Sequence, residues 1–410
     1  MSNLVTLDHL HNDAQLDSDI QYPHALSQYW DKPKAIFLTG ATGFLGTYLL
    51  FELLQQTQAN IYCLVRAEDT PAAMQRLQKQ LSFYQLWQAS FQQRIIPIVG
   101  DLSQANFALS KHAFTELATS IDVIYHNGAQ VNAMYNYSRL KASNVDGTKT
   151  ILRLAGLKQT KPVHFISTLA VFFTDKNQNK TILENEVPKL DQSMKGGYKQ
   201  TKWVAETLIH AAKQRGLVAN IYRPGRIWGD SQTAIMDQFS DLLLNFIQAG
   251  IHLKTYPDLA NIQVNIAPVD YVSRAIVALG QQVNKDHLSI FHLNNPHSIY
   301  WNTLWELIKN QGYSINKVDF IQWKKYIYQG SKQKIKKRVY LTLHHLLRSP
   351  IYIFSQKPEF DTQITVEKLQ HTEISCPIFD KQLLENYLYA FQKQGYIASL
   401  LRKEENHISS

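Results

Sequence analysis

The sequence has little cysteine and no long apolar run, and both absences narrow the classes of protein it can encode. Its two cysteines, Cys63 and Cys376, lie far apart and form no metal-binding or disulfide pattern, which favours a reducing compartment such as the cytoplasm. No run reaches the roughly 18 apolar residues that a membrane-spanning helix needs. The opening stretch, MSNLVTLDHLHNDAQLDSD, is acidic and has no apolar core, so we expect no signal peptide.

The charge balance favours small anionic partners over nucleic acid. The net charge of +9 suits phosphates, CoA or acidic proteins. The basic residues are mostly dispersed and no nucleic-acid-binding motif occurs, so we do not expect a nucleic-acid partner. With 45% hydrophobic and 18% charged residues over 410 positions, the chain is typical of a globular protein with one large α/β domain and an appended second domain.

Short apolar runs alternate with longer amphipathic stretches from residue 34 onward. The runs are apolar nearly throughout, as expected for strands covered on both faces. Alternation on this scale predicts an α/β fold with a Rossmann-type, doubly wound parallel sheet. The expected strands are 34–39, 60–66, 94–99, 122–126, 162–167 and 218–223. The expected helices between them are 46–56, 71–87, 148–157 and 198–214.

This rhythm changes after about residue 224, and the change sets the expected domain boundaries. Residues 1–33 are expected to form a lead-in arm, and 34–230 the nucleotide-binding domain. Residues 231–410 are expected to form mainly a smaller substrate-binding lobe, with some segments, about 262–293, returning to the sheet. Within that lobe, 325–360 is basic and is expected to be irregular.

A glycine-rich turn follows the first expected strand. In TGATGFLGTYLL, Gly40, Gly43 and Gly46 are spaced three residues apart and lead into an amphipathic helix. Glycines at such a place let the backbone approach a pyrophosphate, whose charge is favoured at the N-terminus of the helix. A tight turn also uses glycine, but the strand–turn–helix context favours nucleotide binding.

The end of the second expected strand favours NADPH over NADH. An NAD site usually has an acidic residue here that binds the ribose 2′-hydroxyl. This strand instead ends in CLVRA, with Arg66, and Arg76 lies on the following helix. Two guanidiniums suit a 2′-phosphate. The alternative is that both are solvated or paired with Glu68 and Asp69.

A Tyr-x-x-x-Lys pair, which places a phenol and an ammonium one helical turn apart, is the candidate proton relay. Chain context selects Tyr198/Lys202, because this pair opens the helix after the fifth expected strand, whose end presents Thr168. These three side chains can converge on a nicotinamide ring. The pattern occurs five times: Tyr137/Lys141, Tyr198/Lys202, Tyr313/Lys317, Tyr328/Lys332 and Tyr389/Lys393.

With these motifs in place, the chain resembles the thioester reductase family of extended short-chain dehydrogenases/reductases. That family includes the terminal reductase domains of nonribosomal peptide synthetases, carboxylic acid reductases and α-aminoadipate reductase. The resemblance covers essentially the whole chain. It rests on TGATGFLG, CLVRA, GDLS, HNGAQVN, NVDGT, FISTLAV, GGYKQTKWVAE, YRPGRIWGDS, PVDYVSRAI and FHLNNP.

The resemblance implies a set of functional residues. Thr168, Tyr198 and Lys202 become the catalytic group and also contact the cofactor. Asn144 is a candidate either for support of the relay through the backbone or for helix packing. The other cofactor-binding residues implied, the glycine turn included, are Gly40, Thr42, Gly43, Phe44, Leu45, Gly46, Arg66, Arg76, Asp101, Leu102, Asn127, Gly128 and Ala129.

The reaction implied is NADPH-dependent reduction of an acyl thioester, bound to a carrier protein or to CoA, to the aldehyde or onward to the alcohol. A fatty acyl-CoA reductase, a nucleotide-sugar epimerase or dehydratase, and a non-catalytic NADP sensor are the alternatives. The basic run KQKIKKR, 332–338, is a docking site for an acidic carrier, a solvated loop or, through VYLTLHHLLRSPIYIF, a membrane-surface segment.

Overall fold

The computed structural model describes residues 5–132, 134–236, 241–259, 261–282, 289–332, 337–347 and 358–399. The chain forms two compact units. The first comprises Met1–Ile227, Ala267–Pro296 and Lys357–Cys376, and the second Trp228–Ile266, His297–Gln356 and Pro377–Ser410. The N-terminal arm therefore belongs to the first unit, as does the late segment around residue 360.

A seven-stranded parallel sheet forms the centre of the first unit, in the order β12-β7-β5-β4-β1-β2-β3. From β1 the chain adds β2 and β3 on one side, then β4, β5, β7 and β12 on the other. The strand order therefore reverses between β1 and β4, where such sheets bind ligands at the carboxyl edge. The strands are β1 (Ala35–Thr39), β2 (Asn60–Val65), β3 (Ile95–Val99), β4 (Val123–His126), β5 (Val163–Ile166), β7 (Ala219–Pro224) and β12 (Ser289–Leu293).

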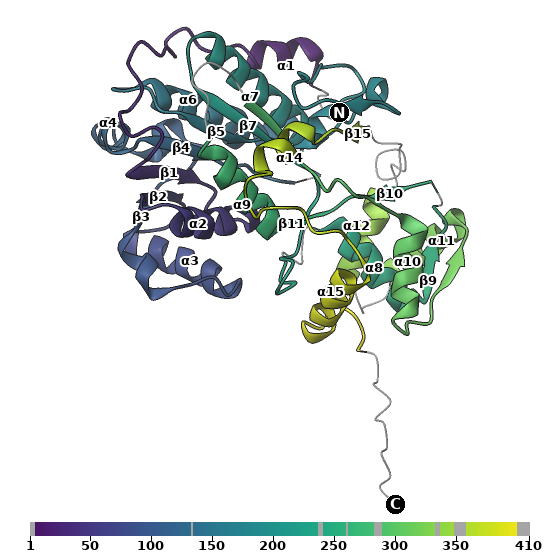
Figure 1. Ribbon diagram of the computed structural model, residues 1–410. Helices are drawn as coiled ribbons and strands as arrows, with labels where there is room; N and C mark the ends of the chain where they lie inside the picture. The colour runs from purple at the N-terminus through teal and green to yellow at the C-terminus, as the bar shows by residue number, and fades with distance from the viewer. Residues whose placement is uncertain are drawn as a thin grey trace, which may run out of the picture. The chain divides into compact units, whose positions relative to one another are not determined.

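Helices cover both faces of this sheet, so the predicted doubly wound α/β fold is confirmed. Figure 1 shows α6 and α7 on one face and α2 and α9 on the other. Burial on both faces explains why the strand sequences are apolar without alternation. The helices are α2 (Phe44–Gln56), α3 (Thr70–Phe83), α4 (Lys111–Ser120), α5 (Tyr137–Lys141), α6 (Gly147–Gly156), α7 (Gly197–Gln214), α9 (Val269–Gly280) and α14 (Gln363–Leu369). Two short strands, β6 (Thr181–Ile182) and β15 (Glu359–Phe360), pair in parallel.

The N-terminal arm, which contains α1 (Leu7–Asp13), is fastened to the α6 and α7 face by charge and by packing. Asp17 pairs with Lys149 at 2.7 Å and with Arg153 at 3.2 Å. The Arg215 guanidinium donates to three backbone carbonyls of the arm, at 2.5 to 2.8 Å. Leu10 and Ile20 of the arm belong to the same buried core as α6 and α7.

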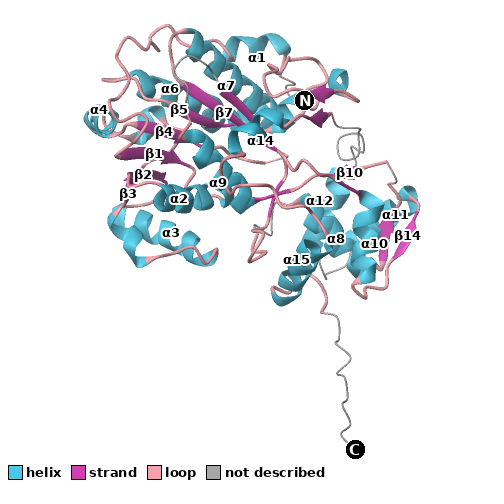
Figure 2. Cartoon of the chain, in the orientation of Figure 1, coloured by secondary structure: helices cyan, strands magenta, loops and turns pink. Residues whose placement is uncertain are grey.

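The second unit is mainly helical, as Figure 2 shows. Its helices are α8 (Leu242–Leu253), α10 (Trp301–Asn310), α11 (Phe320–Ser331), α12 (Lys337–Leu346) and α15 (Lys381–Lys393). β9 (Thr255–Pro257) pairs in parallel with β14 (Asn316–Val318), and β10 (Gln263–Val264) pairs antiparallel with β13 (Ile299–Tyr300). Two further strands, β8 (Ile227–Trp228) and β11 (Ala267–Pro268), fall where the chain passes between the units.

Stacked aromatic rings form the core of this unit. The rings of Phe246 and Trp323 stack at 5.2 Å, and those of Tyr256 and Trp305 at 5.1 Å. The expectation of irregular structure over 325–360 is wrong for the described part. α11 and α12 lie there because each buries one side, α11 through Trp323 and Ile327 and α12 through Tyr340 and Leu343. No helix in the described ranges is both long and apolar enough to cross a membrane.

Candidate active site

The glycine turn joins β1 to α2 with very little space to spare. Gly40 has a φ of +75°, which favours glycine. A Cβ on Gly46 would stand 1.9 Å from the Gly40 carbonyl oxygen, so the third glycine allows the first turn of α2 to approach the end of β1. A Cβ on Gly43 would meet nothing closer than 3.4 Å. The N-terminus of α2 is therefore open at Gly43, and no side chain in the described structure caps it, which fits a pyrophosphate.

The residues after β4 lie directly beside this turn. The Asn127 amide donates to the Gly40 carbonyl at 3.4 Å, and the Gly128 N–H donates to the Thr39 hydroxyl at 2.9 Å. His126 bridges the Thr39 and Thr148 hydroxyls at 2.8 and 3.0 Å. Burial, with a smaller effect of Lys202, lowers the pKa of His126 to about 3, so this ring is a neutral support.

Two arginines meet at the carboxyl end of β2. The Arg76 guanidinium donates to the Arg66 carbonyl at 2.7 Å, and both side chains are exposed. Asp69 caps α3 by accepting from the Ala72 N–H at 2.8 Å, so its carboxylate is engaged locally. Neither arginine forms an ion pair with any residue that the structure describes. The geometry leaves both guanidiniums available to an anion.

Asp101 and Leu102 follow β3 and have different surroundings. The Asp101 carboxylate accepts from the N–H and the hydroxyl of Ser103, at 2.9 and 2.8 Å. The Leu102 side chain would lie 3.0 Å from a Cβ on Gly128. Leu102 is thus packed against the loop after β4, where a flat apolar ring could lie against it.

The candidate relay lies at the junction of β5 and α7. The Lys202 ammonium, which is buried, donates to the Ile166 carbonyl at 2.6 Å and lies 4.1 Å from the Phe165 ring centre. Thr168 follows two residues after Ile166, and its hydroxyl accepts from the Ala170 N–H at 3.2 Å. Tyr198 is in the first turn of α7, one turn before Lys202. The structure therefore brings Thr168 and the Tyr198/Lys202 helix to the carboxyl end of the same strand.

Burial shifts the pKa values of the two relay groups in opposite directions. It raises the pKa of Tyr198 to about 12, so the phenol keeps its proton at neutral pH. It lowers the pKa of Lys202 to about 7, while Glu206 acts in the opposite sense. At neutral pH the pair thus holds a proton donor beside a lysine near its midpoint.

Asn144 connects the loop after β4 to the relay helix. It lies in a π-helical turn, Ala142–Asp146, and is buried. Its side chain accepts from the Gln130 N–H at 2.7 Å and donates to the Thr201 hydroxyl at 3.0 Å. Thr201 in turn donates to the Tyr198 carbonyl at 2.9 Å. Asn144 thus contacts the relay helix through hydrogen bonds as well as through packing.

Three of the other Tyr-x-x-x-Lys pairs make contacts of their own. Tyr313 donates to the Ala398 carbonyl at 3.0 Å, and Lys317 pairs with Asp258 at 3.1 Å. Tyr137 and Lys141 both contact Asp13 of the arm, each at 2.7 Å. The Lys332 ammonium lies 4.4 Å from the Tyr328 ring centre. The three pairs beyond residue 300 belong to the second unit, whereas the sheet that carries the glycine turn belongs to the first.

Sequence reasoning missed a buried ionic cluster under the relay. Glu206 and Arg223 are both fully buried and pair at 2.6 Å, and Ser167 donates to the Glu206 carboxylate. One signal was present in the sequence, since Glu206 follows Lys202 by four residues on the same amphipathic helix. Arg223 stands in YRPGRIWGDS, one of the stretches on which the resemblance rests.

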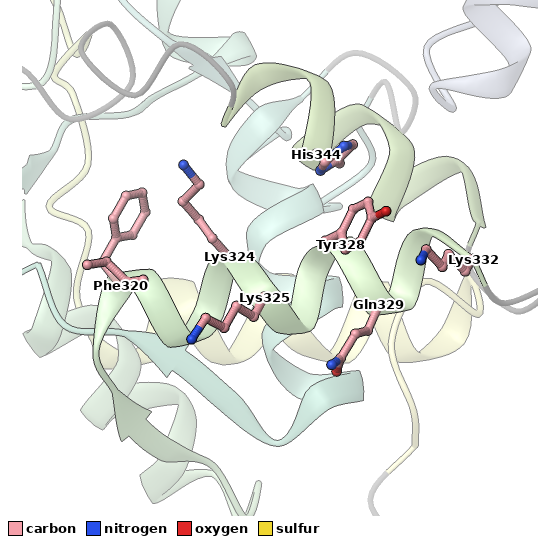
Figure 3. Close-up of a pocket in the computed structure, with 8 residues that line it drawn as sticks. Phe320, Lys324, Lys325, Tyr328, Gln329, Lys332 and His344 are labelled. Atoms are coloured by element: carbon pink, nitrogen blue, oxygen red, sulfur yellow. The ribbon is translucent and has the colours of Figure 1, made fainter.

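An open hollow of about 580 Å³ lies in the second unit, over α11 and α12. Figure 3 shows Lys324 and Lys325 extending from α11, with Tyr328 beside His344 of α12. Of the basic run at 332–338, residues 333–336 lie outside the described structure. The hollow contains no relay or glycine-turn residue, so we place the chemistry at the sheet edge of the first unit.

Known proteins share this combination of fold and motifs. A model of the family described as "Male sterility protein" matches residues 38–276. The terminal R domain of the myxalamid PKS-NRPS biosynthetic pathway has 35% sequence identity and a TM-score of 0.89, and the match covers 95% of this chain and 98% of that one. The chain belongs to the thioester reductase family. The resemblance inferred from the motifs is thereby confirmed.

Curated thioester reductase relatives are much longer proteins. One of the linear gramicidin synthase proteins of Brevibacillus parabrevis is 37% identical over 373 residues, which cover 89% of this chain and 7% of that protein. The L-2-aminoadipate reductase of Candida glabrata, in its large subunit, is 33% identical over 356 residues, covering 82% and 25%. The chain thus matches a small part of each of these proteins. Membership in the family implies an NAD(P)-binding oxidoreductase fold.

Proposed function

We propose that the chain is an NADPH-dependent reductase that converts an acyl thioester to an aldehyde. The observation that carries this proposal is the position of α7. Lys202 of its Tyr198/Lys202 pair donates to the carboxyl end of β5, at the same sheet edge as the open glycine turn after β1. Membership in the thioester reductase family supports the choice of substrate class.

The residues present fit a dinucleotide. The open N-terminus of α2 at Gly43 would hold the pyrophosphate, Leu102 would contact the adenine, and Arg66 and Arg76 would hold a 2′-phosphate. When bound, NADPH supplies the hydride that the acyl carbonyl carbon accepts.

The low cysteine content supports a reducing compartment such as the cytoplasm.

The protein's own groups act on the carbonyl oxygen, where negative charge develops. Thr168 and Tyr198 donate hydrogen bonds to that oxygen, as the donors of an oxyanion hole do. Tyr198 then transfers its proton, and the Lys202 ammonium stabilises the phenolate that remains. The resulting hemithioacetal collapses to an aldehyde and a thiol.

A direct assay separates this function from its alternatives. The purified chain is incubated with NADPH and either an acyl-CoA or an acyl thioester on a carrier protein, and the aldehyde and free thiol are measured. We expect NADPH oxidation matched by aldehyde formation. Activity with long-chain acyl-CoA alone would favour a fatty acyl-CoA reductase, and conversion of a nucleotide sugar without net NADPH oxidation would favour an epimerase or dehydratase.

Arg66→Ala is expected to weaken NADPH binding while leaving NADH binding nearly unchanged. A charge-assisted hydrogen bond to phosphate is worth about 1.5–3 kcal/mol, and only NADPH carries the 2′-phosphate. Steady-state kinetics with both cofactors measure the effect. Lys111→Ala, which removes an exposed cation from α4, is the control. An NADPH/NADH preference equal to that of the wild type would contradict the assignment of Arg66.

We also propose that the acyl group arrives on an anionic carrier protein or on CoA, and that the cationic side of α11 favours the encounter with the carrier. Replacing Lys324 and Lys325 with Ser is expected to lower kcat/KM severalfold for a carrier-bound thioester at low salt. The loss should disappear at high salt, because exposed charges are screened beyond about 8–10 Å. A small free thioester should react at the unchanged rate.

The matched control for this surface is Lys381→Ser on α15, a lysine of the same unit that is 68% exposed. It should leave both substrates unaffected. Equal losses for both substrates in the α11 variant would indicate a folding defect, and no loss with the carrier-bound substrate would exclude a docking role.

A further inference from the structure

Glu206 is a buried carboxylate on the relay helix that the proposed chemistry does not use. It follows Lys202 by four residues on α7, which places it one helical turn further along the same side. Its side chain is fully buried. One carboxylate oxygen, Oε1, accepts from the Arg223 guanidinium at 2.6 and 3.1 Å. Arg223 lies on β7 and is also fully buried.

The other carboxylate oxygen connects α7 to the strand end that carries Thr168. Oε2 accepts from the Ser167 hydroxyl, and the preceding carbonyl, of Ile166, accepts from Lys202. Two successive turns of α7 therefore contact two successive residues at the end of β5. Thr168 is the next residue, so its position depends on this pair of contacts.

The remaining donors of the cluster are satisfied by other elements. Arg223 also donates to the carbonyls of Glu184 and Glu186, at 3.1 and 2.8 Å, and lies 3.2 Å from the His292 ring nitrogen. A buried ion pair is weak evidence for a role in stability, because apolar side chains of similar volume often stabilise a fold equally well. The position of the Glu206–Arg223 ion pair directly behind the relay favours a functional role for it.

We propose that Glu206 is a positioning residue of the relay, which holds Thr168 in register with α7 through Ser167 and keeps Lys202 protonated through its negative charge. This inference rests on the proposed reductase function and adds to it a residue that does not touch the reacting atoms.

The charges around Lys202 agree with this role. Burial acts to raise the pKa of Glu206, but Arg223, His210 at 3.9 Å and the hydrogen bond from Ser167 outweigh it and bring the pKa to about 2, so the carboxylate is ionised. The other titratable groups around Lys202 are Tyr198 and His210 on α7, His126 on β4, and Arg223 on β7, with His292 behind it. Tyr198 and His126 are uncharged at neutral pH.

Removing the carboxylate should therefore move the titration of Lys202 to lower pH. Burial already brings the pKa of Lys202 to about 7, with Glu206 acting to raise it. Since the protonated ammonium supports proton donation by Tyr198, kcat for reduction is expected to fall as pH rises through that pKa. Without the negative charge of Glu206, the fall begins at a lower pH.

The test compares Glu206→Gln with the wild type by two measurements. The ¹³Cε resonance of Lys202, assigned with Lys202→Met, is titrated by NMR in protein labelled at lysine, which requires no substrate. The dependence of kcat on pH is measured from about pH 6 to about pH 9 with an acyl-CoA or aldehyde. We expect the Lys202 titration to move to lower pH, and the ratio of wild-type to variant kcat to rise with pH by up to about tenfold for each unit by which the pKa falls.

Glu184→Gln is the matched control, because Glu184 is a fully buried carboxylate of the same unit that binds Thr365 and the His292 N–H. It should change kcat by a factor independent of pH. If Glu206→Gln behaves in the same way and leaves the Lys202 titration in place, the proposal is overturned and Glu206 is only structural.

A second variant covers the case in which Glu206→Gln fails to fold with Arg223 left uncompensated. Ser167→Ala keeps both charges and removes only the contact to β5, so it should lower kcat by about tenfold, with KM for NADPH and the Lys202 titration unchanged. An unchanged kcat would overturn the role in positioning Thr168. If no thioester or aldehyde is reduced by any form of the protein, the proposed function has failed, and the NMR titration still decides whether Glu206 acts on Lys202.

Discussion

Tyr198→Phe is expected to lower kcat by about 10²–10⁴-fold, the range typical for loss of a general acid. The substitution keeps the aromatic ring and removes only the hydroxyl. Because burial keeps this phenol protonated at neutral pH, it has a proton to donate to the developing alkoxide. NADPH binding, measured by fluorescence titration, should change little, since the glycine turn and both arginines are untouched.

Two further tyrosines of the repeated pattern provide controls for this result. Tyr389 is 62% exposed on α15, and Tyr389→Phe should leave turnover unchanged. Tyr137→Phe loses the hydrogen bond to Asp13, so it should lower stability slightly, with turnover per folded molecule preserved. Full activity in Tyr198→Phe would show that another residue donates the proton.

Gly46→Ala is expected to destabilise the first unit by about 3 kcal/mol or more. The added Cβ would stand 1.9 Å from the Gly40 carbonyl oxygen and 2.8 Å from the Asn127 amide. Overpacking typically costs about 1–3 kcal/mol, and here the obstacle is backbone, which cannot rotate away. Urea unfolding should show a lower midpoint, and NADPH binding should be lost because α2 is displaced from β1.

Gly43→Ala is the comparison that separates folding from cofactor binding. Its Cβ would be 3.4 Å from the nearest neighbour, so the variant should fold with nearly unchanged stability. The methyl group would nevertheless stand at the N-terminus of α2, where the pyrophosphate is proposed to bind, and should weaken NADPH affinity. A Gly46→Ala protein with the wild-type urea midpoint would contradict the tight approach of α2 to β1.

The sheet was predictable from the sequence because each of its first six strands is apolar nearly throughout. The order of the strands was not predicted, because the alternation with helices does not say on which side of β1 each later strand is added. The second unit was harder to predict. α11 carries the partly buried Lys324 and the exposed Lys325, and the buried Trp323 and Ile327 alone did not reveal its periodicity.

The residues of the candidate site also differ in how far the sequence predicted them. Motifs close in sequence, such as the glycine turn and the Tyr198/Lys202 pair, were accessible because one strand or helix positions all their members. The contact of Arg76 with the Arg66 backbone joins a strand end to the next helix, and the cluster of Glu206, Ser167 and Arg223 joins three separate elements. Apart from its spacing of four residues from Lys202, Glu206 has no local signature that distinguishes a buried carboxylate from an exposed one.

The discontinuity of the first unit has a consequence for its synthesis. The edge strand β12 pairs with β7, but the chain between these two strands passes through the second unit. The strand that pairs with β6 comes later still, at Glu359–Phe360. A ribosome adding roughly 5–20 residues per second leaves the β7 edge unpaired for several seconds. An unpaired edge is a template for aggregation. The first unit therefore completes its sheet only after residues 228–266 of the second unit have been synthesised.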